Sequence, residues 1–265
     1  MGYRGLDLTG KAVLVTGGNS GIGLGMAEGM AEAGADIVIW GQNPDKNRAA
    51  EAALKRYGRK VVLLNHNVAD EAAVVRGVQE SADRLGRLDA CFANAGVSGR
   101  TGKHTSFAEM TTEEWRRVMS VNLDGVFFTV RTAVQIMLKQ GQGGSIVVTG
   151  SQFGRMGNPL VEHYAAAKAG VESMMRSMAT EFGRDGIRCN TIVPGYIDTP
   201  LTHARINTPE FVADAMHRHA VGRWGVPADF AGIAVFLASD SSRWTTGQSF
   251  VIDGGFNIAA KIKGA

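Results

Sequence analysis

The sequence has few of the features that mark secreted or membrane-spanning proteins. Only two of its 265 residues are cysteines, and both Cys91 and Cys189 lie in predicted strands, so we expect buried apolar side chains rather than a disulfide. The apolar runs are no longer than a strand, and none predicts a helix that crosses a bilayer. The first residues lack the apolar segment of a signal peptide, and we therefore expect a cytoplasmic protein.

A strong charge of either sign is also missing. The formal net charge is only +3, and Lys and Arg do not cluster, which argues against nucleic acid as the main partner. The six histidines are scattered, so no metal site is predicted. Hydrophobic residues make up 45% of the chain, as in ordinary globular proteins, and a small molecule is the expected partner.

Short apolar segments alternate with helix-length segments along the whole chain. The expected strands lie near residues 12–16, 37–40, 61–64, 88–93, 145–149, 187–193 and 249–252. This alternation predicts an α/β protein with a Rossmann-type, doubly wound parallel sheet of about seven strands and helices on both faces. No linker, repeat or low-complexity tract interrupts the pattern, so we expect residues 1–265 to form a single dinucleotide-binding and catalytic domain.

A glycine-rich turn follows the first expected strand. Residues 16–23 read Thr-Gly-Gly-Asn-Ser-Gly-Ile-Gly and lead into an Ala- and Met-rich segment typical of a helix. Such a turn lets the backbone approach a pyrophosphate, and the helix N-terminus offers unpaired N–H groups to the phosphates. An ordinary strand-to-helix loop is the alternative, but three glycines at this spacing favour a dinucleotide site.

Tyr164 and Lys168 lie four residues apart, which places both side chains on one face of a helix. Their unperturbed pKa values are roughly 10 and 10.4, so a fixed ammonium beside the phenol would lower the pKa of Tyr164. Tyr164 is therefore a candidate general acid and base. The alternative is a half-buried ring beside a solvated amine.

Two further residues are candidates because of their positions. Ser151 follows an expected strand and can hydrogen-bond a substrate oxygen, although loop serines often only cap a turn. Asn122 interrupts a segment that otherwise looks helical from residue 112 to 139, where asparagine is unfavourable. Asn122 is either an exposed polar residue or a side chain that holds a water or a helix kink.

Taken together, these segments resemble the single-domain branch of the short-chain dehydrogenase/reductase family from Leu8 to Phe256. The glycine turn matches the family pattern T-G-x-x-x-G-x-G, and residues 164–168 match Y-x-x-x-K. Residues 94–96 match N-A-G, which in the family lies along the adenine side of the cofactor. Residues 194–199 match P-G-x-x-x-T, which receives the nicotinamide amide.

The resemblance implies hydride transfer between a nicotinamide cofactor and a carbon that bears a hydroxyl or carbonyl group. Tyr164 would exchange the proton on oxygen, and Ser151 would position that oxygen. Lys168 would lower the pKa of Tyr164 and hold the ribose hydroxyls. Asn122 would complete a water-linked proton path behind Lys168.

The same resemblance implies a set of cofactor-binding residues. They are Gly17, Asn19, Ser20, Gly21, Ile22, Gly23, Gln42, Asn67, Val68, Asn94, Ala95, Gly96, Tyr164, Lys168, Pro194, Gly195, Ile197 and Thr199.

The choice between NAD and NADP stays open at this stage. The second expected strand ends without the Asp or Glu that holds the ribose diol in NAD enzymes, and neither Ser20 nor Gln42 is the arginine common in NADP enzymes. Lys46 and Arg48 follow closely and are interpreted as solvated helix residues. Asn67 stands where the family often has an Asp, and its carbonyl can accept the same hydrogen bond.

The substrate pocket is expected to include a lid over the nicotinamide at about residues 196–224. Five cationic residues in loops can meet an anionic or polyol substrate, or can simply be exposed loop cations: Arg100, His104, Arg155, His203 and Arg205.

We expect an NAD(P)-dependent alcohol dehydrogenase or ketone reductase that interconverts a secondary alcohol and a ketone. A 3-oxoacyl thioester reductase, acting on acyl-carrier-protein substrates, shares the same motifs and is the alternative. A non-catalytic dinucleotide sensor or scaffold would be expected to lose Tyr164 or Lys168, and both are present. The resemblance also implies a homotetramer or homodimer that pairs helices at about 112–139 and 160–183, although burial within one subunit explains their apolar faces equally well.

Overall fold

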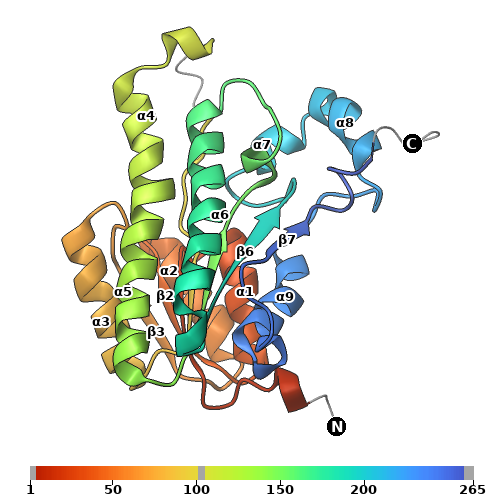
Figure 1. The fold of residues 1–265 in the computed structure, drawn as a ribbon. Helices are drawn as coiled ribbons and strands as arrows, with labels where there is room; N and C mark the ends of the chain where they lie inside the picture. Colours follow the sequence, from red (N-terminus) through yellow and green to blue (C-terminus); the bar gives the residue numbers. More distant parts are fainter. Residues whose placement is uncertain (1–3, 101–104, 260–265) are drawn as a thin grey trace.

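The computed structural model describes residues 4–100 and 105–259 and contains a seven-stranded parallel sheet (Figure 1). Its strands are β1 (Ala12–Thr16), β2 (Asp36–Trp40), β3 (Val61–Leu64), β4 (Ala90–Ala93), β5 (Gly144–Thr149), β6 (Ile187–Pro194) and β7 (Ser249–Ile252). They lie in the order β3-β2-β1-β4-β5-β6-β7. The order reverses between β1 and β4, as in the predicted Rossmann-type fold, which is confirmed.

Helices cover both faces of the sheet. Their bounds are α1 (Gly21–Glu32), α2 (Pro44–Lys55), α3 (Glu71–Leu85), α4 (Thr112–Met119), α5 (Gly125–Gln140), α6 (Glu162–Phe182), α7 (His203–Ile206), α8 (Pro209–Ala215) and α9 (Ala231–Ala238). One buried cluster joins α3, α5 and α6 to the sheet, and a second joins α1, α2 and α9 to the opposite face. Figure 1 shows α5 and α6 on one side and α1 and α9 on the other.

Strand β1 shows how the sequence produces these two layers. Successive side chains of a strand point to opposite faces, so Val13 and Val15 belong to the same apolar cluster as Met26 of α1, whereas Leu14 belongs to the cluster that contains Val130 of α5. All five β1 residues are buried. A parallel sheet that is covered on both faces requires such continuous apolar strands.

The two cysteines lie in the sheet, as predicted. Cys91 in β4 and Cys189 in β6 are free and fully buried among apolar neighbours. Burial raises the pKa of each thiol to about 12. Both therefore act as small apolar side chains.

The segment from 112 to 139 is not one continuous α-helix. Helix α4 ends at Met119, a π-helical turn spans Ser120–Asp124, and α5 begins at Gly125. The π-helical turn contains Asn122, whose side chain is completely buried. The interpretation of Asn122 as a residue at a helix irregularity is confirmed, and the exposed alternative is wrong.

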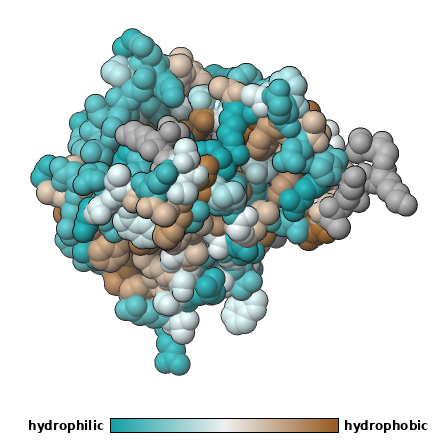
Figure 2. Space-filling view, turned by 90° about the horizontal axis from the view of Figure 1, so that it is seen from above, coloured by the Kyte–Doolittle hydropathy of each residue, from teal (hydrophilic) through white to brown (hydrophobic). Residues whose placement is uncertain are grey.

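The carboxyl ends of the strands carry the loops that form the rest of the molecule. Beyond β6, the chain forms α7, α8 and the turn Met216–Arg218 before it returns through Trp224. A third apolar cluster holds this segment together, with Trp224 and Phe256 at its centre and Tyr196 and Phe211 packed against them. Figure 2 looks onto this end of the molecule, where hydrophilic and hydrophobic side chains are mixed.

In the described part of the chain, no helix combines the length and the apolar character that a membrane crossing needs.

Candidate active site

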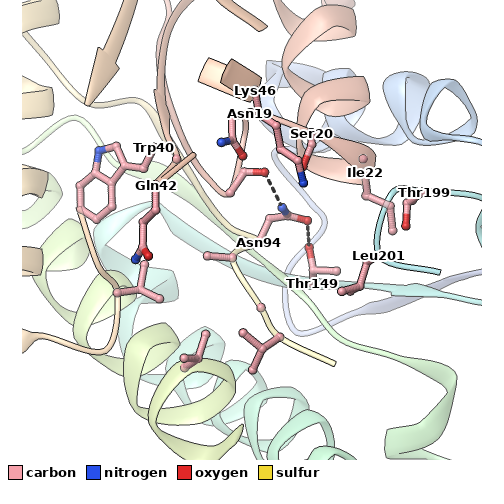
Figure 3. Close-up of a pocket in the computed structure, with 18 of the residues that line it drawn as sticks. Asn19, Ser20, Ile22, Trp40, Gln42, Lys46, Asn94, Thr149, Thr199 and Leu201 are labelled. Atoms are coloured by element: carbon pink, nitrogen blue, oxygen red, sulfur yellow. Dashed lines mark hydrogen bonds between the residues drawn. The ribbon is translucent and has the colours of Figure 1, made fainter. Parts of the chain in front are cut away.

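A cavity of about 490 Å³ lies at the carboxyl ends of β1, β2, β4 and β5. This is the place where a doubly wound sheet binds its ligand, next to the reversal of strand order. The glycine turn, the end of β2, the loop after β4 and the start of α6 all contribute residues to its wall. Figure 3 shows Asn19, Ser20 and Ile22 of the glycine turn on one side and Trp40 and Gln42 on another.

Most of the cofactor-binding residues predicted from the sequence line this cavity. They are Gly17, Asn19, Ser20, Gly21, Ile22, Gln42, Asn67, Val68, Asn94, Ala95, Gly96, Tyr164, Lys168 and Thr199. Gly23, Pro194, Gly195 and Ile197 are not part of its wall. Ile197 is instead buried in the apolar cluster beneath α1 and α9.

The glycine turn needs glycine at two positions because other backbone lies against it. At Gly17, φ is +64°, and an added Cβ would lie 2.9 Å from Cα of Ala95. At Gly23, an added Cβ would lie only 2.3 Å from the carbonyl oxygen of Gly17 and 2.5 Å from Nδ2 of Asn94. Gly23 therefore allows α1 to begin directly against the turn, although Gly23 itself does not face the cavity.

Asn94 holds the glycine turn against β4 and β5. Its amide nitrogen donates to the carbonyl oxygens of Thr16 and Gly17, at 3.2 and 3.3 Å. Its side-chain oxygen accepts from the hydroxyl of Thr149 at 3.0 Å, and Figure 3 shows this chain of contacts. The amide thus fixes three segments of the cavity wall.

Several residues at the β2 end of the cavity were missed by sequence reasoning. Trp40 contacts His66 in a tilted arrangement, with ring centroids 4.8 Å apart, and both line the cavity. The indole nitrogen of Trp40 donates to the hydroxyl of Ser81 at 3.1 Å, which fixes the ring. The signal for these residues was available, since Trp40 is the last residue of β2 and His66 follows β3.

Lys46 is an exposed residue of α2, as interpreted from the sequence, and it also lines the cavity (Figure 3). Asn43 caps α2, and its side-chain oxygen accepts from the backbone N–H groups of Asp45 and Lys46. Arg48 instead pairs with Asp45 on the exposed surface of the same helix. In the described part of the chain, no acidic residue lines the cavity.

Tyr164 and Lys168 lie on one face of α6, as their spacing predicts. The Lys168 amine is buried, lies 5.6 Å from the centroid of the Tyr164 ring and donates to the carbonyl oxygen of Thr149 at 2.6 Å. The alternative of a solvated amine is therefore wrong. Burial lowers the pKa of Lys168 to about 8.

The predicted direction of the Tyr164 pKa shift is wrong for the protein alone. Burial raises the pKa of the phenol above its ordinary value, and a hydrogen bond with Ser151 only partly offsets this effect. Desolvation disfavours the phenolate, and the nearby amine does not overcome it. The folded protein alone therefore disfavours loss of the phenol proton more than water does.

Ser151 caps a turn, as one of its two interpretations predicts, and its contact with a substrate oxygen stays a prediction. Its hydroxyl oxygen accepts a hydrogen bond from the backbone N–H of Phe153 at 3.2 Å, so it caps the turn Gln152–Gly154. Its side chain also interacts with Tyr164. Ser151 and Tyr164 therefore form one polar pair at the start of α6.

Asn122 is connected to the loop after β4. Its amide nitrogen donates to the carbonyl oxygen of Val97, and its side-chain oxygen accepts from the N–H of Val97, both at 2.9 Å. Arg117 supports the same loop by donating to the carbonyl oxygen of Ser98 at 2.8 Å while it forms an ion pair with Glu114. Sequence reasoning missed this pair, which has no motif to mark it.

The loop cations divide into two groups. Arg155 pairs with the buried Glu172 at 2.7 Å, and His203 pairs with Asp198 at 2.7 Å. Arg100 and Arg205 have no carboxylate partner among residues 4–100 and 105–259. His104 lies outside the described residues.

Comparison with known proteins identifies the family. A family model described as enoyl-(acyl carrier protein) reductase matches residues 17–257. The chain is 36% identical to L-rhamnose 1-dehydrogenase (NAD(P)(+)) from Sphingomonas sp. (strain SKA58), over 95% of this chain and 98% of the relative. It is 38% identical to the NADP-dependent (R)-specific alcohol dehydrogenase from Lentilactobacillus kefiri, over 94% and 97%. The chain belongs to the short-chain dehydrogenase/reductase family.

A solved structure supports the same assignment. The gluconate 5-dehydrogenase from Burkholderia cenocepacia J2315, in complex with NADP and tartrate, superimposes with a TM-score of 0.89 at 32% identity, covering 97% of this chain and 99% of that one. As a short-chain dehydrogenase/reductase, the present protein is an NAD(P)-dependent oxidoreductase that acts on CH–OH groups.

The cavity of this short-chain dehydrogenase/reductase fits a dinucleotide. At Gly41, an added Cβ would meet Nδ2 of Asn19 at 2.1 Å and Oδ1 of Asn47 at 2.3 Å, so a side chain there would disrupt the wall between the glycine turn and β2. Lys46, His66 and Lys168 line the cavity without an acidic residue, which suits a ligand that carries several negative charges.

Proposed function

We propose that this enzyme interconverts a small, hydroxylated secondary alcohol and the corresponding ketone with NADP(H), with Tyr164 as the proton-transfer residue. The cofactor, when bound, accepts or donates the hydride. Tyr164 exchanges the proton on the substrate oxygen, and Ser151 orients that oxygen. The single observation that supports this best is the pairing of Ser151 with Tyr164 beside the buried amine of Lys168.

The protonated phenol suits the direction of ketone reduction. Because burial raises the pKa of Tyr164, the residue carries the proton that a developing alkoxide must receive. Lys168 lines the same cavity and is the proposed partner of the ribose hydroxyls. Asn122 is proposed to act by fixing the loop at Val97, which flanks the cavity.

Residues outside the cavity wall complete the proposed cofactor site. Pro194, Gly195 and Ile197 are proposed to reach the nicotinamide through their backbone, together with Thr199. Residues 196–224 are proposed to act as the lid, and the apolar cluster around Trp224 supports a segment that moves as one body. The chain as a whole, residues 1–265, is proposed to be one domain.

Replacing the phenol tests this function. Tyr164→Phe removes the exchangeable proton, and turnover should fall at least ~100-fold. Thermal shift with NADPH should remain as in the wild type, because the ring stays in place. Unchanged turnover would contradict the role of Tyr164. A 3-oxoacyl thioester reductase would use the same residues, so the substrate panel should include an acetoacetyl thioester.

Preference for NADP over NAD is supported by charge. Lys46 lines the cavity at the end of β2, and Asn19, Ser20 and Gln42 offer polar groups there without a carboxylate. A 2′-phosphate would meet a cation and no repulsion at this position.

We also propose a cytoplasmic homo-oligomer, either a tetramer or a dimer. Helix α5, which lies next to α6 (Figure 1), leaves Phe127 and Leu138 exposed by 40% and 42%. An exposed apolar helix face favours association with another copy. Light scattering tests this, and a monomer would refute it.

A further inference from the structure

Two half-buried arginines, one on the loop after β4 and one on α7, lack the acidic partner that several neighbouring arginines have. Around the lid and the active-site loops, Arg117, Arg155 and Arg223 each form an ion pair with a carboxylate at 2.7–2.8 Å. Arg100 and Arg205 have no such partner within the described part of the chain. Arg218 of the lid also has no carboxylate partner among the described residues, but its guanidinium lies over the Phe256 ring, 4.1 Å from the centroid.

Arg100 lies on the loop that follows β4, directly after a glycine that packs against Tyr164. The preceding residue, Gly99, is packed so closely that an added Cβ would lie 2.7 Å from Cβ of Tyr164. The Arg100 guanidinium donates to Oδ1 of Asn158 at 3.2 Å and to the carbonyl oxygen of Pro159 at 3.0 Å. Its Nε is buried and has no acceptor among residues 4–100 and 105–259. The guanidinium is therefore fixed between two active-site loops with donor capacity to spare.

Arg205 approaches from the lid, on α7. Its guanidinium lies 4.9 Å from the centroid of the Phe211 ring, and Phe211 packs edge-on against Tyr196 at 5.1 Å. Tyr196 in turn contacts Phe153 at 5.9 Å, and Phe153 contacts Tyr164 at 6.4 Å. A continuous set of aromatic rings thus joins Arg205 to the proton-transfer residue.

The two arginines are close enough to repel one another. Burial lowers the pKa of Arg205, and the charge of Arg100 lowers it further. Both charges act on Tyr196, where they oppose the rise in pKa that burial causes. Two like charges in a partly desolvated region cost free energy unless an anion binds between them.

We propose that Arg100 and Arg205 bind an oxyanion on the substrate, so that the enzyme acts on a hydroxylated compound that carries a carboxylate or a phosphate. The planar guanidinium offers paired donors that match both groups. This inference rests on the proposed function, since it adds a charged end to an alcohol or ketone whose reacting carbon lies at Tyr164.

A series of six-carbon alcohols tests the proposal. Sorbitol, gluconate and sorbitol 6-phosphate share several secondary hydroxyls and differ in the terminal group. We expect kcat/KM with NADP for at least one of the two anions to exceed that for sorbitol about 100-fold, since two charge-assisted contacts each contribute about tenfold or more. The better anion identifies the group, carboxylate or phosphate. Equal values for all three compounds would overturn the proposal.

Variants of Arg100 and Arg205 test whether these two side chains cause the preference for an anionic substrate. Arg100→Gln and Arg205→Gln should each lower kcat/KM for the preferred anion at least ~10-fold, mainly through KM, and lower it much less for sorbitol. Arg100→Lys and Arg205→Lys retain the charge and should recover part of the loss. Arg184→Gln is the matched control, because Arg184 is exposed in the turn Gly183–Asp185 before β6, at the opposite end of the sheet. An equal loss for anion and sorbitol would overturn the proposal.

The failure of this proposal can be told apart from failure of the proposed function. Suppose that cyclohexanol is oxidised in a Tyr164-dependent reaction, but kcat/KM for gluconate and for sorbitol 6-phosphate does not exceed that for sorbitol. The proposed oxyanion site is then wrong, and the proposed function stands. If no alcohol or ketone in the panel reacts, although NADPH stabilises the protein, the proposed function itself is wrong.

Discussion

The cavity wall beside β1 and β4 and the wall beside residues 196–224 are held in place by different kinds of contact. On the first wall, backbone touches backbone, as at Gly17 and Gly23, and the amide of Asn94 bonds to main-chain oxygens. On the second, aromatic rings pack around Tyr196, and Arg205 lies over one of them. The first wall therefore tolerates few substitutions, whereas substitutions of side chains in the second wall can change which ligand it binds.

The difference follows from what each wall must bind. A pyrophosphate is the same in every dinucleotide, and N–H groups at a helix N-terminus suit it. A substrate varies from enzyme to enzyme, and side chains on loops can vary with it.

The largest effect on cofactor binding is expected from a methyl group placed between the backbone segments of the first wall. Gly23→Ala would put a Cβ 2.3 Å from the carbonyl oxygen of Gly17. We expect the Kd for NADPH to rise about 100-fold, which corresponds to about 2.8 kcal/mol. Isothermal titration measures it.

The control for this variant is Gly232→Ala in α9, where no atom lies within 4 Å of the added Cβ. It should leave cofactor binding as it is and raise stability by about 0.5–1 kcal/mol, because alanine favours a helix. If Gly23→Ala binds NADPH as tightly as this control does, the first wall is less rigid than its contacts indicate.

The buried amine of Lys168 should make the free energy of unfolding depend on pH. The pKa of Lys168 is lowered from 10.5 to about 8 by burial, so between these values the unfolded chain binds more protons than the folded one. The free energy of unfolding should therefore rise with pH across this window, relative to Lys168→Met, by a few kcal/mol, since each pKa unit corresponds to about 1.4 kcal/mol.

Urea denaturation of the wild type and of Lys168→Met at several pH values between 7 and 10.5 measures this difference. Lys139→Met, an exposed substitution near the end of α5, serves as the control and should run parallel to the wild type. A constant difference between the wild type and Lys168→Met would show that the amine is not desolvated in the folded protein.

The smallest expected effect concerns Lys46, which lines the part of the cavity at the end of β2. Lys46→Ala should weaken NADPH binding about tenfold, or about 1.4 kcal/mol, and should leave NADH binding nearly unchanged, because only the 2′-phosphate would lose its partner. Arg48→Ala on the same helix is the matched control, since Arg48 pairs with Asp45. Equal losses for NADPH and NADH would contradict the proposed role of Lys46.

Periodicity and motif spacing were sufficient for the parts of the molecule that depend on local structure. The alternation of short apolar segments with helix-length segments predicted the parallel sheet, because a parallel strand that is covered by helices on both sides must be apolar on both faces. The spacing of Tyr164 and Lys168 predicted a shared helix face, because the period of a helix is fixed. The glycine-rich motif predicted a turn at the end of β1, and the turn lines the cavity.

Only the tertiary structure decided how charge and solvent act on those residues. It raises the pKa of Tyr164 by burial, and it places Lys46 at the cavity. It also separates Arg155, which has a carboxylate partner, from Arg100 and Arg205, which have none among the described residues. Desolvation and ion pairing depend on atoms far away along the chain, so no local pattern in the sequence can determine them.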